Sequence, residues 1–176
     1  MNLYFDKKGN KEYLVIEDAH IMFPNFRGIP DQFTVKGHRH FCVEITEDVV
    51  NEMLDAGWNV RHTNPRNEEY QPVPYIDVNI NWNYEKNKIP VVTFITSGNE
   101  TVIDEDVVGD LDTAEIERVD MAIEPSFYKK KDGSGWGIKG YVSTLDAYLY
   151  EDPIRRRRSE RLRAAREEEE QIPFEE

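Results

Sequence analysis

Aromatic and basic side chains occur together in several parts of this chain, and their combination predicts a surface for a single-stranded nucleic acid. Flat rings can stack on bases, at roughly 1–3 kcal/mol per base, while cations follow the phosphates. Burial in the core is the alternative for most of the rings, although Lys129–Lys131 beside Trp136 cannot all be buried. The candidate residues are Phe26, Arg27, Arg39, Phe41, Arg61, Trp82, Lys129, Lys130, Lys131, Trp136, Lys139 and Tyr141.

A second pattern, His38-x-His40-x-Cys42, places three zinc-binding residue types on one face of an expected strand. Positions i, i+2 and i+4 of a strand spread over roughly 13 Å, which is too far for one ion. No CxxC or HxxxH motif accompanies them, although His20 and His62 remain available as further ligands. We therefore expect no metal site, with Cys42 in the core and the histidines either packing or touching phosphate.

Patterns typical of catalysis are missing from the sequence. It contains neither a nucleophile elbow nor a phosphate-binding glycine loop, and its carboxylates show no spacing that implies metal-assisted hydrolysis. The glycine-rich stretch at 133–137 has no helix after it, so it predicts a turn. The sequence therefore indicates neither an enzyme nor a cofactor.

Residues 155–176 change abruptly in character. Four arginines, Arg155–Arg158, are followed by four glutamates, Glu167–Glu170, and then by Ile172-Pro173-Phe174. Isolated charges are costly to bury, so this segment predicts a solvated helix followed by a flexible peptide. A tail that only improves solubility is one explanation, but it does not require a bulky aromatic residue in water. We therefore expect Ile172, Pro173 and Phe174 to bind a partner protein.

The composition supports one compact domain at 1–150 and an appendage at 151–176. The hydrophobic share of 39%, with eight Phe, nine Tyr and three Trp, is enough for a single core. No run of roughly 18 apolar residues occurs, so we expect no membrane span, and the charged N-terminus does not resemble a signal peptide. One cysteine, Cys42, excludes an internal disulfide framework and is typical of a reducing cytoplasm.

The formal net charge of −13 argues against general attraction to nucleic acid. Residues 151–176 do not account for this charge, because they contain seven arginines against nine acidic residues. A nucleic-acid site must therefore be a local basic groove in an otherwise acidic protein.

The elements that would position these residues are mostly short strands. A helix is expected at 46–57, where Thr46 precedes acidic residues and Gly57 ends the helix. Its apolar face consists of Val49, Val50, Met53 and Leu54. Alternating and β-branched segments predict strands at 11–24, 38–45, 58–63, 75–83, 89–96, 100–104, 114–128 and 138–150, with a basic hairpin tip at 129–137. Up to eight strands with one good helix predict an all-β barrel with a helical insertion.

A second helix is expected at the C-terminal end. Asp152-Pro153 supplies an N-cap and a proline at the first helical position, and Pro173 must end the helix. Its apolar residues form only a thin stripe, so we expect it to be exposed. Opposite charges at i,i+4 would support it by roughly 0.3–0.5 kcal/mol per pair, in the pairs Glu151/Arg155, Asp152/Arg156, Arg163/Glu167 and Arg166/Glu170.

Four short segments carry a family resemblance: IMFPNFRG (21–28), GHRHFCV (37–43), GWNV (57–60) and GIKGYV (137–142). Between Val15 and Leu149 the chain resembles the single-stranded DNA-binding proteins found in bacteriophage replication modules. The resemblance implies an elaborated OB-fold barrel, protection of single strands during phage DNA replication or recombination, and an acidic tail that contacts partners. It places six residues near the strand-binding face: Phe26, Arg27, Arg39, Phe41, Lys139 and Tyr141.

The acidic tail also resembles the C-terminal tip of bacterial single-stranded DNA-binding proteins. In that tip phenylalanine is the last residue, and its free carboxylate is part of what partners grip. Here Glu175 and Glu176 follow Phe174. The difference implies that partners of the bacterial tip bind this tail weakly or not at all.

Together these observations predict a sequence-independent single-stranded DNA-binding protein in the cytoplasm of an infected bacterium, with replication or recombination proteins as partners of the tail. The rival hypothesis is a phage protein-interaction adaptor or host-takeover factor that does not bind nucleic acid, and RNA binding is a third. Exposed strand edges in an open barrel would also allow homo-oligomers, although nothing in the sequence specifies them.

Overall fold

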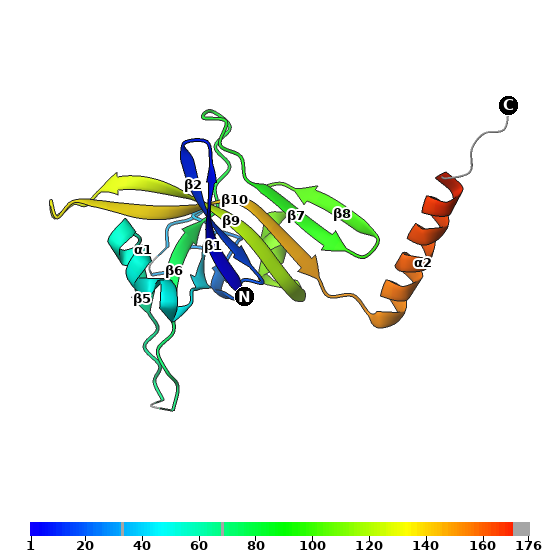
Figure 1. Ribbon diagram of the computed structural model, residues 1–176, viewed down its shortest axis with the longest axis horizontal. Coiled ribbons are helices and arrows are strands. Elements are labelled where there is room, and N and C mark those ends of the chain that lie inside the picture. Colours follow the sequence, from blue (N-terminus) through cyan, green and yellow to red (C-terminus); the bar gives the residue numbers. More distant parts are fainter. Residues whose placement is uncertain (33, 68, 171–176) are drawn as a thin grey trace.

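The computed structural model describes residues 1–32, 34–67 and 69–170, with the backbone alone for 168–170 (Figure 1). The predicted partner-binding residues Ile172, Pro173 and Phe174 lie outside the described residues. The helical elements are the 3₁₀ turns η1 (Glu47–Val49) and η2 (Val108–Asp112) and the helices α1 (Val50–Ala56) and α2 (Pro153–Glu170). The strands are β1 (Asn2–Lys8), β2 (Lys11–Glu17), β3 (Ile21–Asn25), β4 (His40–Glu44), β5 (Val60–His62), β6 (Pro74–Asn79), β7 (Val91–Thr96), β8 (Asn99–Ile103), β9 (Ile116–Lys129) and β10 (Trp136–Leu149).

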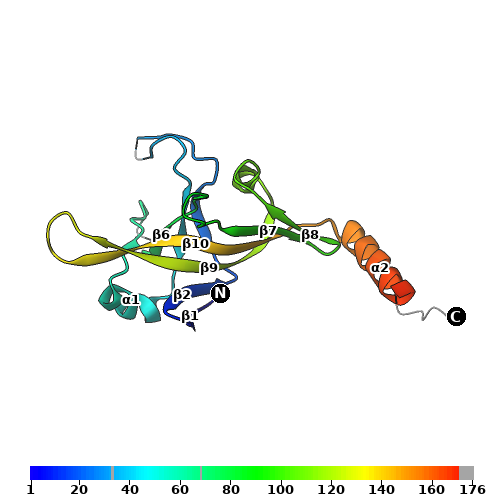
Figure 2. The same cartoon turned by 90° about the horizontal axis from the view of Figure 1, so that it is seen from above.

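All ten strands of the described chain belong to one sheet, which is organised around β10. The main path is β1-β2-β9-β10-β6-β4-β3, with β5 beside β6 and β8 beside β7. β9 pairs antiparallel with almost all of β10, whose other edge pairs in parallel first with β6 and then with β7. The β9–β10 hairpin projects from one end of the body and α2 lies beyond the other (Figure 1 and Figure 2). The predicted all-β class with one inserted helix is confirmed.

The sheet begins with a hairpin that the sequence analysis missed. β1 and β2 pair from Asn2 with Glu17 to Lys8 with Lys11, which leaves the two-residue turn Gly9-Asn10. Gly9 has a φ of 66°, as turns between twisted strands require. The Gly9-Asn10 dipeptide was therefore the signal in the sequence that could have predicted this hairpin.

The strand expected at 11–24 is divided into β2 and β3. Asp18, between them, has a φ of 55°, which an extended strand does not allow. After this break the chain changes partners, because β2 pairs with β9 whereas β3 pairs with β4. One continuous pattern of hydrophobic residues thus serves two different parts of the sheet.

The inserted helix follows the prediction except at its start. Gly57 has a φ of 99°, and its N–H donates to the Leu54 carbonyl at 3.0 Å, so the predicted end is confirmed. Thr46 makes no side-chain capping bond, and the first turn is the 3₁₀ turn η1. Val50 and Met53 are buried, whereas Leu54, expected on the same face, is exposed.

Three aromatic residues predicted for the binding face belong to the core instead. Phe26 and Phe41 are 1% and 0% exposed, and their ring centroids lie 5.0 Å apart. Trp82 is 8% exposed, with the Arg39 guanidinium 6.0 Å from its ring centroid. The pairing of β4 with β6 sets Phe41 opposite buried Val78. Protein atoms already cover these rings, so their assignment to base stacking is wrong.

The start of α2 agrees with the prediction. Asp152 Oδ1 accepts the backbone N–H of Ile154 at 2.9 Å and that of Arg155 at 3.4 Å, which confirms Asp152 as the N-cap. In the described part of the chain no helix is both long and apolar enough to cross a membrane. The predicted end of α2 at Pro173 lies outside the described residues.

Two of the four predicted ion pairs of α2 are wrong, because their carboxylates have other partners. Asp152 caps the helix, and Arg156 pairs instead with Glu117 of β9 at 2.5 Å. Glu151 accepts hydrogen bonds from the N–H and the Oγ of Ser97, at 2.9 and 2.6 Å, and these bonds lower its pKa. Of the other two pairs, Arg163/Glu167 is confirmed at 3.0 Å, and Arg166/Glu170 lies outside the described side chains.

Candidate nucleic-acid interface

The β9–β10 hairpin has an outer face that carries polar and aromatic side chains. Residues opposite each other in an antiparallel ladder point to the same side of the sheet. The register therefore puts three pairs on the outer face: Gly137 with Tyr128, Lys139 with Ser126, and Tyr141 with Glu124. The alternate residues of β10 are Ile138, Gly140 and Val142, all buried.

The ring of Tyr128 lies directly against the backbone of Gly137. A Cβ at position 137 would stand only 2.7 Å from Cζ of Tyr128, so the missing side chain is what allows this approach. Lys139 Nζ lies 5.4 Å from the centroid of the same ring, within the range of a cation–π contact. One cation and one ring are thereby held together on the outer face of the hairpin.

Tyr141 lines a cavity of about 270 Å³ together with Arg61 of β5 and His38. His38 Nε2 lies 2.7 Å from Oδ1 of Asn79, whose Nδ2 donates to the carbonyl of Gly140 at 3.2 Å. Because the amide nitrogen bonds Gly140, the amide oxygen faces His38, and Nε2 is the donor. A buried asparagine of β6 therefore positions this imidazole beside β10.

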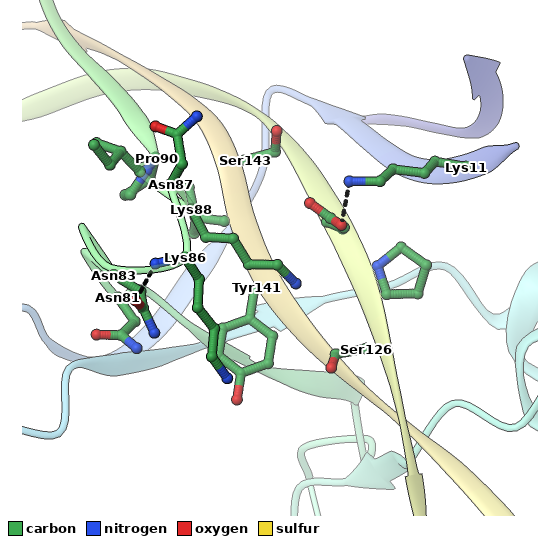
Figure 3. Close-up of a pocket in the computed structure, with 14 residues that line it drawn as sticks. Lys11, Asn81, Asn83, Lys86, Asn87, Lys88, Pro90, Ser126, Tyr141 and Ser143 are labelled. Carbon is green, nitrogen blue, oxygen red and sulfur yellow. Dashed lines mark hydrogen bonds and ion pairs between the residues drawn. The ribbon is translucent and has the colours of Figure 1, made fainter. Parts of the chain in front are cut away.

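Tyr141 also lines a second cavity, of about 320 Å³, next to the loop before β7 (Figure 3). Lys86 and Lys88 extend from this loop toward Tyr141 in Figure 3. The loop is a tight turn, in which Asn83 and Lys88 exchange backbone hydrogen bonds of 2.8 and 2.9 Å and Asn87 has a φ of 50°. Asparagine tolerates this left-handed backbone, so the turn directs both lysines across β10.

The two cavities meet at Tyr141, and we call them together the basic groove. It is defined by Arg61, Lys86, Lys88, Tyr128, Lys139 and Tyr141. The rings of Tyr128 and Tyr141 are partly exposed, so part of each remains accessible. The groove therefore combines the two side-chain types that single strands require.

Charge in the basic groove is locally positive. Two carboxylates line the cavities, and both have partners: Glu124 accepts from Lys11 Nζ at 2.7 Å, and Asp77 lies 3.2 Å from His40 Nδ1. The bond to Glu124 and its charge raise the pKa of Lys11. No described carboxylate lies within ion-pair distance of the four cations that remain, Arg61, Lys86, Lys88 and Lys139. The net charge of −13 thus coexists with the local basic groove that the sequence required.

Lys129–Lys131 and Trp136 lie at the tip of the hairpin, which projects beyond the body (Figure 2). The three lysines are exposed, and Trp136 is 65% exposed. Trp136 stands opposite Lys129, on the same side as Phe127, and so faces away from the basic groove. The tip is closed by Asp132, which accepts from the N–H and the Oγ of Ser134 at 2.9 and 2.7 Å; these bonds lower the pKa of Asp132.

Arg27 and Arg39, also predicted for the site, lie outside the basic groove. Arg39 is 22% exposed, and its Nη2 donates to the backbone carbonyl of Glu105 at 3.2 Å. Arg27 lies against Gly109, and its backbone N–H donates to the Asp112 carboxylate at 2.9 Å. Both arginines connect the sheet to the segment around η2, and the structure does not bring them together with Lys139 and Tyr141.

His40 and Cys42 have structural partners. His40 Nδ1 lies 3.2 Å from Asp77 Oδ1, and its Nε2 lies 3.1 Å from Thr34 Oγ1. Cys42 is buried, and burial raises the pKa of its thiol to about 11. Over residues 1–32, 34–67 and 69–170, no three His, Cys, Asp or Glu side chains are grouped so that they could hold a metal ion.

Three members of the basic groove were not predicted: Tyr128, Lys86 and Lys88. For Tyr128 the signal was its position opposite Gly137 across the predicted hairpin. For the lysines it was the spacing of Asn83 and Asn87, which is typical of a tight turn. Neither signal indicates which strand the turn approaches, because the loop and β10 are far apart in the sequence.

The comparisons with known proteins concern the family and the fold of the chain. A family model described as "Putative phage ssDNA-binding domain" matches residues 5–171. The chain resembles the structure of the single-stranded DNA-binding protein from bacteriophage Enc34 in complex with ssDNA, with a TM-score of 0.51 and 10% identity over 86% of this chain and 97% of that one. A C-terminal truncation of the Enc34 protein gives a TM-score of 0.50 and 10% identity over 87% and 98% of the two chains. No curated protein matches the chain by sequence.

The structural likeness confirms the predicted fold, an OB-like barrel type of β architecture followed by a C-terminal helix. The family is one of DNA-binding proteins and not of enzymes, in agreement with a sequence that shows no catalytic pattern. Its model extends through the sheet and along α2. Because the match covers nearly the whole sequence, the chain belongs to the phage ssDNA-binding domain family.

Proposed function

We propose that this protein binds single-stranded DNA in the basic groove, independently of base sequence. The observation that carries the proposal is the meeting of the partly exposed rings of Tyr128 and Tyr141 with four cations that have no ion-pair partner among the described residues. Membership of the family supports it. The structure of the Enc34 protein with ssDNA supports it further, since that chain has a similar fold.

In the proposed mechanism, bases stack on Tyr141 and Tyr128 while phosphates are neutralised by the four cations of the groove. Each stacked base contributes about 1–3 kcal/mol, and any base offers a π-face, so binding does not depend on sequence. Lys130 and Lys131, at the tip of the projecting hairpin, would add cations beyond Lys139, whereas Lys129 and Trp136 lie on the other side of the hairpin. Because phosphate contacts release counterions, affinity falls as salt rises, with a slope of about −0.7 per contact on single strands.

The biological setting is part of the proposal. A phage protein of this kind would protect single strands during DNA replication or recombination in the cytoplasm of the infected host. Residues 1–150 would bind DNA, and the acidic residues with Ile172-Pro173-Phe174 would recruit replication or recombination proteins. Enrichment of such proteins on the full-length chain, but not on a chain ending at Glu170, tests the role of the tail.

A fluorescence titration with labelled oligo-dT at two salt concentrations tests DNA binding directly. The full-length protein is compared with a variant in which Arg61, Lys86, Lys88 and Lys139 are replaced by Gln. We expect salt-sensitive binding by the natural protein and a loss of at least about tenfold in the variant. If the natural protein does not bind the oligomer, the proposal is wrong, and the adaptor hypothesis becomes the better explanation. Competition between DNA and RNA oligomers tests RNA as the preferred ligand.

A further inference from the structure

Helix α2 carries an unusual concentration of arginine. Between Pro153 and Arg166 it contains seven arginines and a single acidic residue, Glu160. No acidic side chain lies in its first turn and no basic side chain in its last. The helix dipole favours the opposite arrangement, with anions at the N-terminus and cations at the C-terminus. The stability of the helix therefore does not explain where these arginines lie.

One side of α2 is attached to the body. Arg156 pairs with Glu117 of β9 at 2.5 Å. Ser159 lies so close to the β7–β8 turn that a Cβ at Gly98 would stand 3.1 Å from it. Just before the helix, Glu151 accepts two hydrogen bonds from Ser97. These contacts fix which face of the helix points toward the sheet.

The opposite face of α2 is basic and has no ion-pair partner in the described part of the chain. At 100° per residue, Arg157, Arg158 and Arg161 lie on the side away from Arg156 and Ser159. All three are exposed, and none makes a hydrogen bond or ion pair with another described residue. The sequence had suggested a helix neutralised by its own ion pairs, but the capping role of Asp152 and the Ser97 bonds of Glu151 remove two of those pairs.

We propose that Arg157, Arg158 and Arg161 form a second phosphate-binding surface, which holds nucleic-acid backbone that extends beyond the basic groove. Guanidinium groups match phosphate oxygens in a two-pronged geometry. Residues 153–170 contain no aromatic side chain, so this surface has nothing on which a base could stack. β10, whose Tyr141 lines the groove, leads toward α2 (Figure 1). Tyr141 and Leu149 are about 26 Å apart by strand rise. The inference rests on the proposed function.

The test uses the full-length protein and dT oligomers of about 10 and about 40 nucleotides, one near the size that an OB fold covers and one well beyond it. The variant Arg157→Gln/Arg158→Gln/Arg161→Gln should lose about tenfold in affinity for the long oligomer at low salt, and about two units of salt slope. Its affinity for the short oligomer should not change. Glutamine has nearly the helix propensity of arginine, and circular dichroism verifies that α2 remains. Replacement of the three arginines by Lys should restore much of the affinity.

A matched control removes three cations elsewhere, as Lys36→Gln/Arg66→Gln/Arg163→Gln, none of which lines the basic groove or lies on the outer face of α2. Equal losses in the two triple variants would overturn the inference, because general charge would then explain them. Unchanged binding of the long oligomer would also overturn it and would leave an acidic protein as the ligand of α2. If the natural protein binds neither oligomer, the proposed function itself fails, which is a different result from either of these.

Discussion

β10 begins in the hairpin that carries the basic groove and ends at α2, and these two basic regions differ in what surrounds their cations. In the groove, lysines and an arginine stand beside the partly exposed rings of Tyr128 and Tyr141. On α2, the arginines have no aromatic side chain in the same helix, and the apolar residues Ile154 and Leu162 are exposed at 78% and 56%. The first region can contact bases and phosphates, whereas the second can contact phosphates without reading bases.

This difference predicts different selectivity at the two ends of the strand. Rings reach bases only where the bases are unpaired, so the basic groove should prefer single strands. Arginines that contact backbone phosphates should bind single and double strands alike. Strand selectivity should therefore depend on the groove, while α2 should add affinity without changing the preference.

The largest expected effect on stability comes from removing a ring that lies in the hydrophobic core and not in the basic groove. Phe41→Ala removes a fully buried ring beside Phe26 and should lower the free energy of unfolding by about 3–5 kcal/mol. Chemical denaturation measures the loss. At a temperature where the variant remains folded, its affinity for oligo-dT should be unchanged. Normal stability combined with lost DNA binding would show that Phe41 belongs to the binding face after all.

The next effect concerns the residue at which the two cavities meet. Tyr141→Ala should weaken oligo-dT binding by about 1–3 kcal/mol, or about 5- to 150-fold, because one stacked base is lost. Binding to a duplex should change much less, so the ratio of the affinity for single strands to the affinity for duplex should decrease. Tyr150→Ala is the matched control, since Tyr150 is an exposed tyrosine just beyond the other end of β10. Equal losses in the two variants would contradict the role of the groove.

A smaller effect is expected from the lysines of the turn before β7. Lys86→Gln/Lys88→Gln should reduce the salt slope of oligo-dT binding by about 0.7 for each lysine that contacts a phosphate. Titrations at several salt concentrations measure it. Lys7→Gln/Lys8→Gln removes the same charge from β1, where neither lysine lines a cavity of the groove. An unchanged slope in the Lys86/Lys88 variant would limit the groove to the half around Arg61 and Lys139.

The smallest effect tests how the groove holds its second ring. Gly137→Ala places a Cβ about 2.7 Å from Tyr128 Cζ, so the ring must move. We expect affinity for oligo-dT to fall by less than the loss of a whole stacked base, that is, by under about 1 kcal/mol. The substitution should have no effect in a Tyr128→Ala background, which a double-mutant cycle measures. Additive losses would mean that Gly137 acts on the hairpin backbone rather than through the ring.

Local sequence signals predicted much of the fold. Gly57 at the end of α1, Asp152 at the start of α2 and the long strands on both sides of 129–137 all depend on neighbours within a few residues, and each agrees with the structure. The β1–β2 hairpin was missed although its Gly-Asn turn is equally local. The start of α1 was wrong because Thr46 does not cap the helix.

The candidate site was predicted less well, because its formation depends on contacts between distant segments. Lys139 and Tyr141 were predicted from the basic aromatic hairpin and from the family resemblance, but Phe26, Phe41 and Trp82 were predicted from the same combination of aromatic and basic residues and are buried. Whether a ring is covered depends on which segments fold next to it, and β4, which carries Phe41, pairs with β6 from far along the chain. Alternation alone cannot distinguish a core face from a binding face.

The sequence by itself determined which structural elements this protein has: an all-β chain with one inserted helix, a basic aromatic hairpin and an arginine-rich terminal helix. These follow from local periodicity, turn residues and caps, which depend on short-range backbone sterics and hydrogen bonds. The tertiary structure alone decided which rings remain open, which cations remain unpaired and that the turn before β7 meets β10 at Tyr141. Those outcomes depend on burial and charge pairing between segments far apart in the chain, which only the folded sheet brings together.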